Sequence, residues 1–235
     1  MSVMVFLAII HAKAPNFQSG TVFVYFTIRT TCCRLMHVSG RDFLTDERSL
    51  MTGHTFPVLL ARHPALNGVA GRCYGRLDIP LAAGWEEGAT LLAERLLNVG
   101  CEVIHSSPSS RCLSISRYLA ARTHREVVVD PRLAELDFGL WEGMLWDEVP
   151  RDALDRWGAD PKGFAPPKGE SGQALIARVQ SYWADFVCKK IGTCVVSHGG
   201  PLRLFKGLAC GQTPDLLAPS MSLGTAELFN ISLSA

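Results

Sequence analysis

The stretch Phe56-Pro-Val-Leu-Leu-Ala-Arg-His63 joins a short apolar run to an arginine and a histidine. The run from Phe56 to Ala61 is typical of a buried strand, so the Arg-His pair follows the carboxyl end of that strand. A matching stretch, Val195-Val-Ser-His-Gly-Gly200, places His198 after a second predicted strand. In open α/β sheets, ligands bind outside the carboxyl ends of the strands. The two histidines are therefore expected to meet at one edge of a sheet.

Apolar runs and helical spacings alternate along the rest of the chain. Strands are predicted at 56–61, 101–105, 126–129, 193–196 and 226–231, and helices at 85–99, 108–122, 171–190 and from Gly199 onward. The clearest helix, 171–190, has an apolar face at Leu175, Val179, Tyr182 and Phe186. Strands that alternate with helices predict an α/β architecture with a mostly parallel sheet. The Pro- and Gly-rich stretch 161–172 is expected to be a surface loop.

A third strand end carries the stretch Ser106-Ser-Pro-Ser-Ser-Arg111. Ser107 is expected to cap a helix that has Pro108 at its first position, which places Arg111 in the first turn. The free N–H groups of such a turn favour an anion. A histidine or arginine alone after a strand is usually a packed or solvated residue. Arginine and histidine at three strand ends together suit a phosphate dianion, whose oxygens Arg binds in pairs.

Composition and missing motifs exclude several classes of protein. Hydrophobic residues make up 48% of the 235 residues and charged residues 19%, which excludes a disordered chain. The formal charge of +1 does not favour nucleic acid as a partner. The chain contains neither the G-x-x-x-x-G-K of a P-loop nor the G-x-S-x-G of a serine hydrolase. An anion site must therefore be built locally from a few arginines and histidines.

The eight cysteines form no C-x-x-C pair, and the seven histidines are scattered, so the spacing of a zinc site is absent and no metal is expected. Most of the cysteines lie inside apolar runs, as buried free thiols do. We therefore expect a reducing, cytoplasmic compartment, with a disulfide framework as the alternative.

The first 50 residues are set apart from the rest. Met1 to Ile10 is apolar but lacks the basic start of a signal peptide. Thr21 to Ile28 is much shorter than the roughly 20 residues that span a bilayer, so no membrane is expected as a partner. We expect residues 1–50 to be an appendage of unknown role and residues 51–235 to be the functional domain, with Met51 as an alternative start.

Five stretches, in order, resemble the motifs of the histidine phosphatase superfamily, whose fold is phosphoglycerate mutase-like. They are Arg62-His63, Gly75-Arg-Leu-Asp-Ile-Pro-Leu81, Ser106 to Arg111, Arg132-Leu-Ala-Glu-Leu-Asp-Phe-Gly-Leu-Trp-Glu-Gly143, and Ser197-His-Gly-Gly200. The resemblance covers roughly residues 56–230. It implies a three-layer α/β sandwich with a mostly parallel central sheet.

The resemblance also implies phosphoryl transfer that needs no metal or cofactor. His63 would attack phosphorus and form a phosphohistidine, and Glu135 would protonate the leaving oxygen and then activate water. The phosphate oxygens would be bound by Arg62, Arg111 and His198, where charge develops in the transition state. A nucleophilic histidine must be neutral, which a reference pKa of about 6.5 allows at neutral pH.

Two of these expectations, the identity of the acid and the role of Arg76, have alternatives. Asp137 and Glu142 compete with Glu135 for the role of acid. Gly199 and Arg76 are expected to contact phosphate or substrate, although Arg76, like Arg72, could equally be a surface arginine of a loop.

The chain departs from the family pattern at Pro64, where the family usually has glycine. This change puts secondary phosphate contacts and mutase activity in doubt. The stretch 73–76 resembles the α-ribazole phosphatase branch, which implies α-ribazole 5′-phosphate, a small-molecule phosphomonoester of cobalamin biosynthesis, as substrate. The alternatives are a phosphoglycerate mutase-type phosphoryl transferase and a non-catalytic module that binds a phosphorylated ligand.

Overall fold

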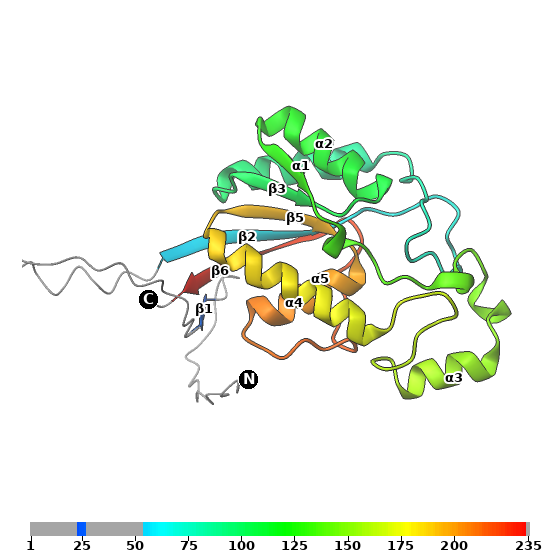
Figure 1. Ribbon diagram of the computed structural model, residues 1–235. Coiled ribbons are helices and arrows are strands. Elements are labelled where there is room, and N and C mark those ends of the chain that lie inside the picture. Colours follow the sequence, from blue (N-terminus) through cyan, green and yellow to red (C-terminus); the bar gives the residue numbers. More distant parts are fainter. Residues whose placement is uncertain (1–22, 27–53, 234–235) are drawn as a thin grey trace, which may run out of the picture.

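The computed structural model describes residues 23–26 and 54–233, and its centre is a six-stranded sheet in the order β1-β6-β2-β5-β3-β4 (Figure 1). The strands are β1 (Phe23–Phe26), β2 (His54–Arg62), β3 (Val103–Ser106), β4 (Glu126–Val129), β5 (Thr193–Ser197) and β6 (Ala226–Leu233). The four strands β2, β5, β3 and β4 run parallel, and β6 runs antiparallel to β2. The predicted mostly parallel sheet is confirmed.

The short strand β1 comes from the segment that the sequence sets apart, and it pairs with β6 in parallel. The other residues from 1 to 53 lie outside the described part of the chain. The predicted division at residue 50 and the alternative start at Met51 therefore stay predictions.

Helices cover both faces of the sheet and complete three layers. α1 (Trp85–Asn98) and α2 (Ser110–Thr123) lie on one face, and α4 (Gly172–Lys189) and α5 (Gly199–Ala209) lie on the other (Figure 1). α3 (Arg151–Ala159) lies away from the sheet, beyond one of its ends. No helix within the described ranges is long and apolar enough to cross a membrane.

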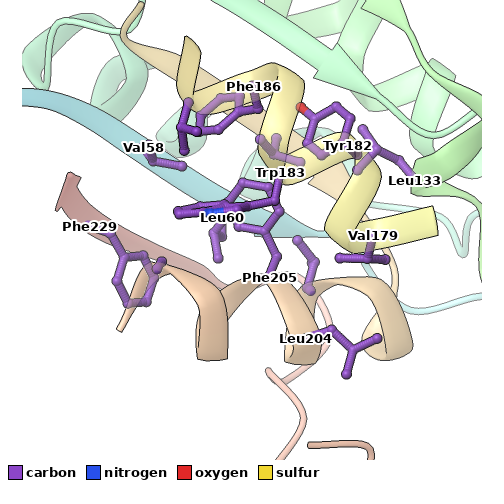
Figure 2. Packing of buried hydrophobic residues seen from close by; sticks show 14 of the residues in the cluster. Val58, Leu60, Leu133, Val179, Tyr182, Trp183, Phe186, Leu204, Phe205 and Phe229 are labelled. Atoms are coloured by element: carbon purple, nitrogen blue, oxygen red, sulfur yellow. The ribbon is translucent and has the colours of Figure 1, made fainter. Parts of the chain in front are cut away.

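The apolar run of β2 is continuous because both of its faces are buried, as is typical of a central strand in a parallel sheet. Val58 and Leu60 pack against the helices α4 and α5, where Phe186 and Phe205 meet them (Figure 2). Leu59 belongs to the separate core beneath α1 and α2. The strand is therefore held from both sides, and its carboxyl end is fixed in place.

Helix α4 follows the predicted pattern closely. Its apolar face is buried in the core, and the Ser171 side chain caps the helix by accepting from the backbone N–H of Ala174 at 3.2 Å. The chain leaves the helix at Lys190, which has a φ of 54° and so ends the helix in the left-handed conformation.

Three local predictions need correction. Helix α2 begins at Ser110 with Ser109 as its N-cap position, so Ser107 and Pro108 belong to the extended turn before it. Strand β3 begins at Val103 rather than at Cys101. Helix α3 was not predicted, because only nine residues form it and their apolar side chains pack on a small aromatic cluster rather than on the sheet.

That aromatic cluster is built from residues 138–164 and contains rings in edge and stacked contact. Trp157 of α3 stacks on Trp146 at 6.1 Å between ring centroids and meets Phe138 edge-on at 5.8 Å. Trp141 and Phe164 stack at 5.9 Å. The cluster gives α3 and the loops beside it a core of their own.

The sheet register brings three strand ends to one edge. Arg62 of β2 is paired with Ser197 of β5, and Ser106 of β3 is paired with Val196. The residues that follow these strands, His63, His198 and Ser107, therefore emerge side by side.

Candidate active site

The imidazoles of His63 and His198 lie next to each other, with 5.2 Å between ring centroids and 63° between ring planes. The side chains are 1% and 0% exposed. The backbone N–H of His63 donates to the carbonyl of Ser197 at 3.2 Å, which extends the pairing of β2 and β5 by one residue. The structure thus brings together the two histidines that the sequence predicts to meet.

His63 is held in one orientation by its neighbour. Its Nδ1 lies 2.8 Å from the carbonyl oxygen of Pro64. A carbonyl can only accept, so we assign the proton to Nδ1, and Nε2 keeps its lone pair. Burial lowers the pKa of His63 to about 4, against the opposing hydrogen bond to Pro64, and the charges of Arg111 and Arg62 lower it further. The ring is therefore neutral near pH 7.

His198 is held by the turn before α2. Its Nε2 lies 2.7 Å from the hydroxyl of Ser107 and 3.0 Å from that of Ser109. Arg111 donates from Nε to Nδ1 at 3.3 Å, so we assign the ring proton to Nε2. Burial, followed by the charge of Arg111, lowers the pKa of His198 well below its ordinary value.

Arg111 is 1% exposed and is fixed by the loop after β2. Its Nη1 donates to the carbonyl of Leu77 at 2.8 Å and its Nη2 to that of Gly75 at 2.6 Å. With the bond to His198, three of the five N–H groups of this guanidinium donate to protein. Two N–H groups are left for a ligand.

Glu135 lies against the start of α5. Its carboxylate accepts from the backbone N–H of Leu136 at 3.0 Å and of Gly200 at 3.1 Å. A Cβ at position 200 would collide with that carboxylate, and one at Gly199 would lie 2.8 Å from the Ser220 hydroxyl and 3.1 Å from Arg62 Nη2. The two glycines after His198 thus make room for the side chains of Glu135 and Arg62.

The two rival carboxylates have other partners. Glu142 accepts from the backbone N–H groups of Arg76 at 2.7 Å and Phe138 at 3.0 Å. Asp137 accepts from the backbone of Gly139 at 2.8 Å and pairs with Arg76 at 3.3 Å. Glu135 is the carboxylate of these three that lines the cavities beside the histidines.

The Arg62 side chain is held by the segment that precedes β6. Its Nη1 donates to the Ser220 hydroxyl at 3.2 Å and to the Met221 carbonyl at 2.5 Å. Its Nε is buried and has no acceptor among the described residues. Its Nη2 makes no hydrogen bond in the part of the chain that the structure describes, so the two N–H groups on Nη2 are available to a ligand.

Arg76 lines the smaller of the two cavities, and three of its five N–H groups donate to protein. It pairs with Asp137 and Glu170, both at 3.3 Å, and its Nε donates to the carbonyl of Glu135 at 3.2 Å. The predicted contact with substrate would use the two N–H groups that remain, and it stays a prediction. Arg76 fixes the backbone of the loop that carries Glu135.

Two cavities flank the histidines, and Glu135 lines both. The smaller, of about 290 Å³, has polar residues among those that line it, including Ser107, Ser109, Arg111 and His198. The larger, of about 410 Å³, includes Arg62, Gly199 and Gly200, and its other walls are mostly apolar. No group of three or more potential metal ligands occurs in the described part of the chain.

Sequence reasoning missed the role of Arg178, a residue of α4. This side chain donates to the backbone carbonyls of Arg132, Ala134 and Glu135 at 2.7, 2.6 and 3.0 Å. It also holds Glu170 with two bonds, at 2.7 and 2.9 Å. Nothing in the sequence near Arg178 signals the three carbonyl partners, because they lie more than 40 positions away.

Relatives of known sequence match most of the chain. The model of the histidine phosphatase superfamily (branch 1) matches residues 58–234. Phosphoserine phosphatase 1 of Hydrogenobacter thermophilus is 32% identical over 153 residues, which are 62% of this chain and 72% of that protein. The probable phosphoglycerate mutase GpmB of Enterobacter sp. (strain 638) is 34% identical over 186 residues, which are 75% of this chain and 82% of that protein.

Solved structures match the same region. The α-ribazole phosphatase from Shigella flexneri has a TM-score of 0.67 at 26% identity, covering 74% of this chain and 89% of that one. A putative α-ribazole-5′-P phosphatase from Escherichia coli K-12 has a TM-score of 0.68 at 22% identity, covering 77% and 94%, and this likeness shows the fold alone. The matched family model and these relatives lead to one conclusion: this chain belongs to the histidine phosphatase superfamily.

Proposed function

We propose that this protein hydrolyses a phosphomonoester without a metal, through a phosphohistidine on His63. The observation that carries the proposal is the bond between His63 Nδ1 and the Pro64 carbonyl. It directs the proton to Nδ1 and leaves the Nε2 lone pair free in a ring that burial keeps neutral. Arg62 and Arg111 lie close enough to lower the pKa of this ring, and each has N–H groups left for phosphate oxygens.

In the first step, His63 Nε2 attacks phosphorus in line with the ester bond. A P–N bond forms, the P–O bond to the leaving group breaks, and the leaving oxygen takes a proton from Glu135 as the alcohol departs. Arg62, Arg111 and His198, which we assign as ligands of the phosphate oxygens, stabilise the charge that develops on them.

In the second step, water attacks the phosphorus of the phosphohistidine. Glu135, now a carboxylate, takes a proton from that water, and the P–N bond breaks. Inorganic phosphate leaves and His63 returns to its neutral form. The position of Glu135 on both cavities supports its use in both steps.

The favoured substrate is α-ribazole 5′-phosphate, which would place the protein in cobalamin biosynthesis. The likeness to the Shigella flexneri α-ribazole phosphatase supports this choice. The alternative is phosphoryl transfer of the phosphoglycerate mutase type, which the similarity to GpmB of Enterobacter favours. The release of inorganic phosphate separates the two, because a mutase returns its phosphoryl group to an organic product.

The experiment that tests the proposal is a trap of the intermediate. Incubation with a ³²P-labelled phosphomonoester in EDTA, followed by an alkaline quench, should give a labelled protein whose label is lost in acid. His63→Ala should give no label and lose at least ~10³-fold in rate, as loss of a covalent nucleophile typically does. Calorimetric titration of His63→Ala with inorganic phosphate checks that the site still binds. An unlabelled wild-type protein with no turnover would leave the non-catalytic alternative, a module that binds a phosphorylated ligand.

The free thiols support the proposed cytoplasmic location. All six cysteines of the part that the structure describes are unpaired: Cys73, Cys101, Cys112, Cys188, Cys194 and Cys210. Free buried thiols are typical of proteins from reducing compartments.

A further inference from the structure

The hydroxyls of two serines contact the same nitrogen of His198. Its Nε2 lies 2.7 Å from Ser107 Oγ and 3.0 Å from Ser109 Oγ. Its other nitrogen, Nδ1, faces Arg111 Nε, and a guanidinium can donate but cannot accept. The proton of the neutral ring is therefore on Nε2, and this N–H is directed to the two hydroxyls. Each hydroxyl can accept from His198, and neither can donate to Nε2.

This arrangement excludes a nucleophilic serine at the site. A serine that attacks phosphorus must give its proton to a base, and the base in contact with these hydroxyls would be His198 Nε2. Nε2 already carries the ring proton. A second proton would charge a ring whose pKa burial lowers well below its ordinary value. The two hydroxyls therefore keep their protons and act as hydrogen-bonding groups.

Ser109 lies at the N-cap position of α2 but does not cap this helix. The side chain of a serine at that position usually accepts from a backbone N–H of the first turn. Here the Ser109 side chain makes no such bond. Asp78, from the loop after β2, accepts instead from the backbone N–H of Ser110 at 3.1 Å. The Ser109 hydroxyl is left to contact His198, and a residue that breaks a local rule in this way is expected at a functional site.

The proton of the Ser109 hydroxyl has only weak acceptors in the part of the protein that the structure describes. Ser107 Oγ lies 3.4 Å away, which is longer than the usual O–H···O range. The other acceptor is the thiol of Cys112. Burial raises the pKa of this thiol to about 12, and a hydrogen bond from Ser109 opposes the rise. Because a thiol sulfur accepts weakly, a charged phosphate oxygen is the stronger partner for the Ser109 proton.

Of the two hydroxyls, that of Ser109 is the one that a ligand can reach. His198 and Ser107 are 0% exposed, whereas Ser109 is partly buried and lines the smaller cavity. The proposed phosphate ligands come from both cavities, because Arg62 lines the larger and Arg111 the smaller. The phosphoryl group must therefore lie between these two arginines, with the donors of the smaller cavity on one side of it.

We propose that the Ser109 hydroxyl is a further ligand of the phosphoryl group, which it contacts from the smaller cavity. It accepts from the Nε2–H of His198 and donates its own proton to a phosphoryl oxygen, so part of the effect of His198 on the phosphate passes through Ser109. No proton is transferred, and that of Ser109 stays on Oγ in both steps. Hydrogen bonds in a chain polarise one another, so the N–H behind this hydroxyl strengthens it as a donor. The inference rests on the proposed phosphatase function and adds one donor to the groups that stabilise the transition state.

The variant Ser109→Ala tests the proposal, because it removes this hydroxyl and leaves Ser107 to hold His198. We expect kcat/KM to fall about 10- to 100-fold, as loss of a hydrogen bond to a charged group does. The loss should agree within about threefold for an alkyl phosphate and for 4-nitrophenyl phosphate, because the donor acts on the phosphoryl oxygens and not on the leaving oxygen. Ser114→Ala, on an exposed side of the same helix, is the matched control and should stay within about twofold of wild type.

Two further measurements separate a phosphate ligand from a residue that only positions His198. In the His63→Ala background, Ser109→Ala should bind inorganic phosphate about tenfold more weakly in a calorimetric titration. A two-bond ¹H–¹⁵N spectrum of the Ser109→Ala protein, labelled in histidine, should still show the His198 proton on Nε2, because Arg111 and Ser107 remain in place. A change of tautomer that accompanies the loss of rate would make Ser109 a positioning residue and overturn the inference.

The outcomes separate this inference from the proposed function. A wild-type rate in Ser109→Ala, or a loss confined to the alkyl phosphate, would overturn the role of Ser109 and leave the phosphatase intact. If Ser109→Ala fails to fold, Ser109→Cys makes the same test, since a thiol is a weak donor. Absence of both turnover and labelled protein in the wild type, with every ester, would refute the proposed function itself.

Discussion

The backbone N–H of Gly200 donates to the carboxylate of Glu135 at 3.1 Å, and the chain leaves no room for a Cβ between them. The proposed acid is thus positioned by the first turn of α5, the helix that follows His198 directly. Partial positive charge at a helix N-terminus attracts the carboxylate. The same short segment therefore positions both His198, the proposed phosphate ligand, and Glu135, the proposed acid.

Gly200→Ala should displace Glu135 and slow the hydrolysis of alkyl phosphates about 10- to 100-fold, because a displaced Glu135 loses only part of the roughly 10²- to 10⁴-fold that general acid catalysis contributes. The loss should be much smaller for 4-nitrophenyl phosphate, whose leaving group needs no proton. Steady-state kinetics with both esters measures the difference. Gly88→Ala in α1 is the control, because a Cβ there meets nothing within 4 Å. Equal losses on both esters would contradict the positioning of Glu135.

Glu135→Gln should keep the hydrogen bond to Gly200 but remove the proton that the leaving oxygen takes. The rate for an alkyl phosphate should fall about 10²- to 10⁴-fold. With 4-nitrophenyl phosphate, phosphorylation of His63 should stay fast and the second step should slow, so a burst of nitrophenol should precede slow turnover. Stopped-flow absorbance measures that burst. Unchanged turnover of the alkyl phosphate would remove Glu135 from the mechanism.

The low pKa of His63, about 4, makes its reaction insensitive to pH near neutrality. The folded pKa lies below the ordinary value, so the ring is neutral above about pH 5 and gains its proton only at lower pH. Between pH 8 and pH 6, single-turnover labelling of His63 by 4-nitrophenyl phosphate should change less than about twofold. A histidine with the ordinary pKa of about 6.5 would be roughly three-quarters protonated at pH 6. If the labelling rate at pH 6 fell in that proportion, the His63 ring would not be shielded from water.

Arg178 should act as a positioning residue for the loop that carries Glu135. Arg178→Met would remove one of the two donors to the Glu135 carbonyl and leave Glu170, which is 12% exposed, with Arg76 as its remaining arginine partner. We expect kcat for an alkyl phosphate to fall about tenfold or more with little change in KM, because phosphate binding does not involve Arg178. Urea unfolding should show a loss of about 1–3 kcal/mol, because the bonds to three carbonyls are removed while Glu170 keeps its pair with Arg76.

Arg178→Lys provides the control for that prediction. A lysine can pair with Glu170 but cannot reach three carbonyls at once, since it lacks the planar fork of arginine. It should recover part of the stability and little of kcat. Full recovery of kcat by lysine would show that the charge matters and the carbonyl contacts do not.

Much of this site could be predicted from the sequence, because its residues follow strands directly. A buried parallel strand is a continuous apolar run, so the ends of β2 and β5 could be recognised and the residues after them placed at one edge. The pairing of Arg62 with Ser197 makes the meeting of His63 and His198 a consequence of register. The Arg62-His63 and His198-Gly-Gly200 stretches were therefore enough to predict the centre of the site.

Only the tertiary structure decided which arginine N–H groups donate to the protein itself and which remain for a ligand. Arg76, Arg111 and Arg178 are alike in sequence, yet Arg76 and Arg178 hold the loop of Glu135 while Arg111 donates to the ring of His198. Helix α3 and its aromatic cluster were likewise missed, since they pack against neighbours outside the sheet. The physical reason is that these roles depend on contacts between segments far apart in the chain, which no local pattern encodes.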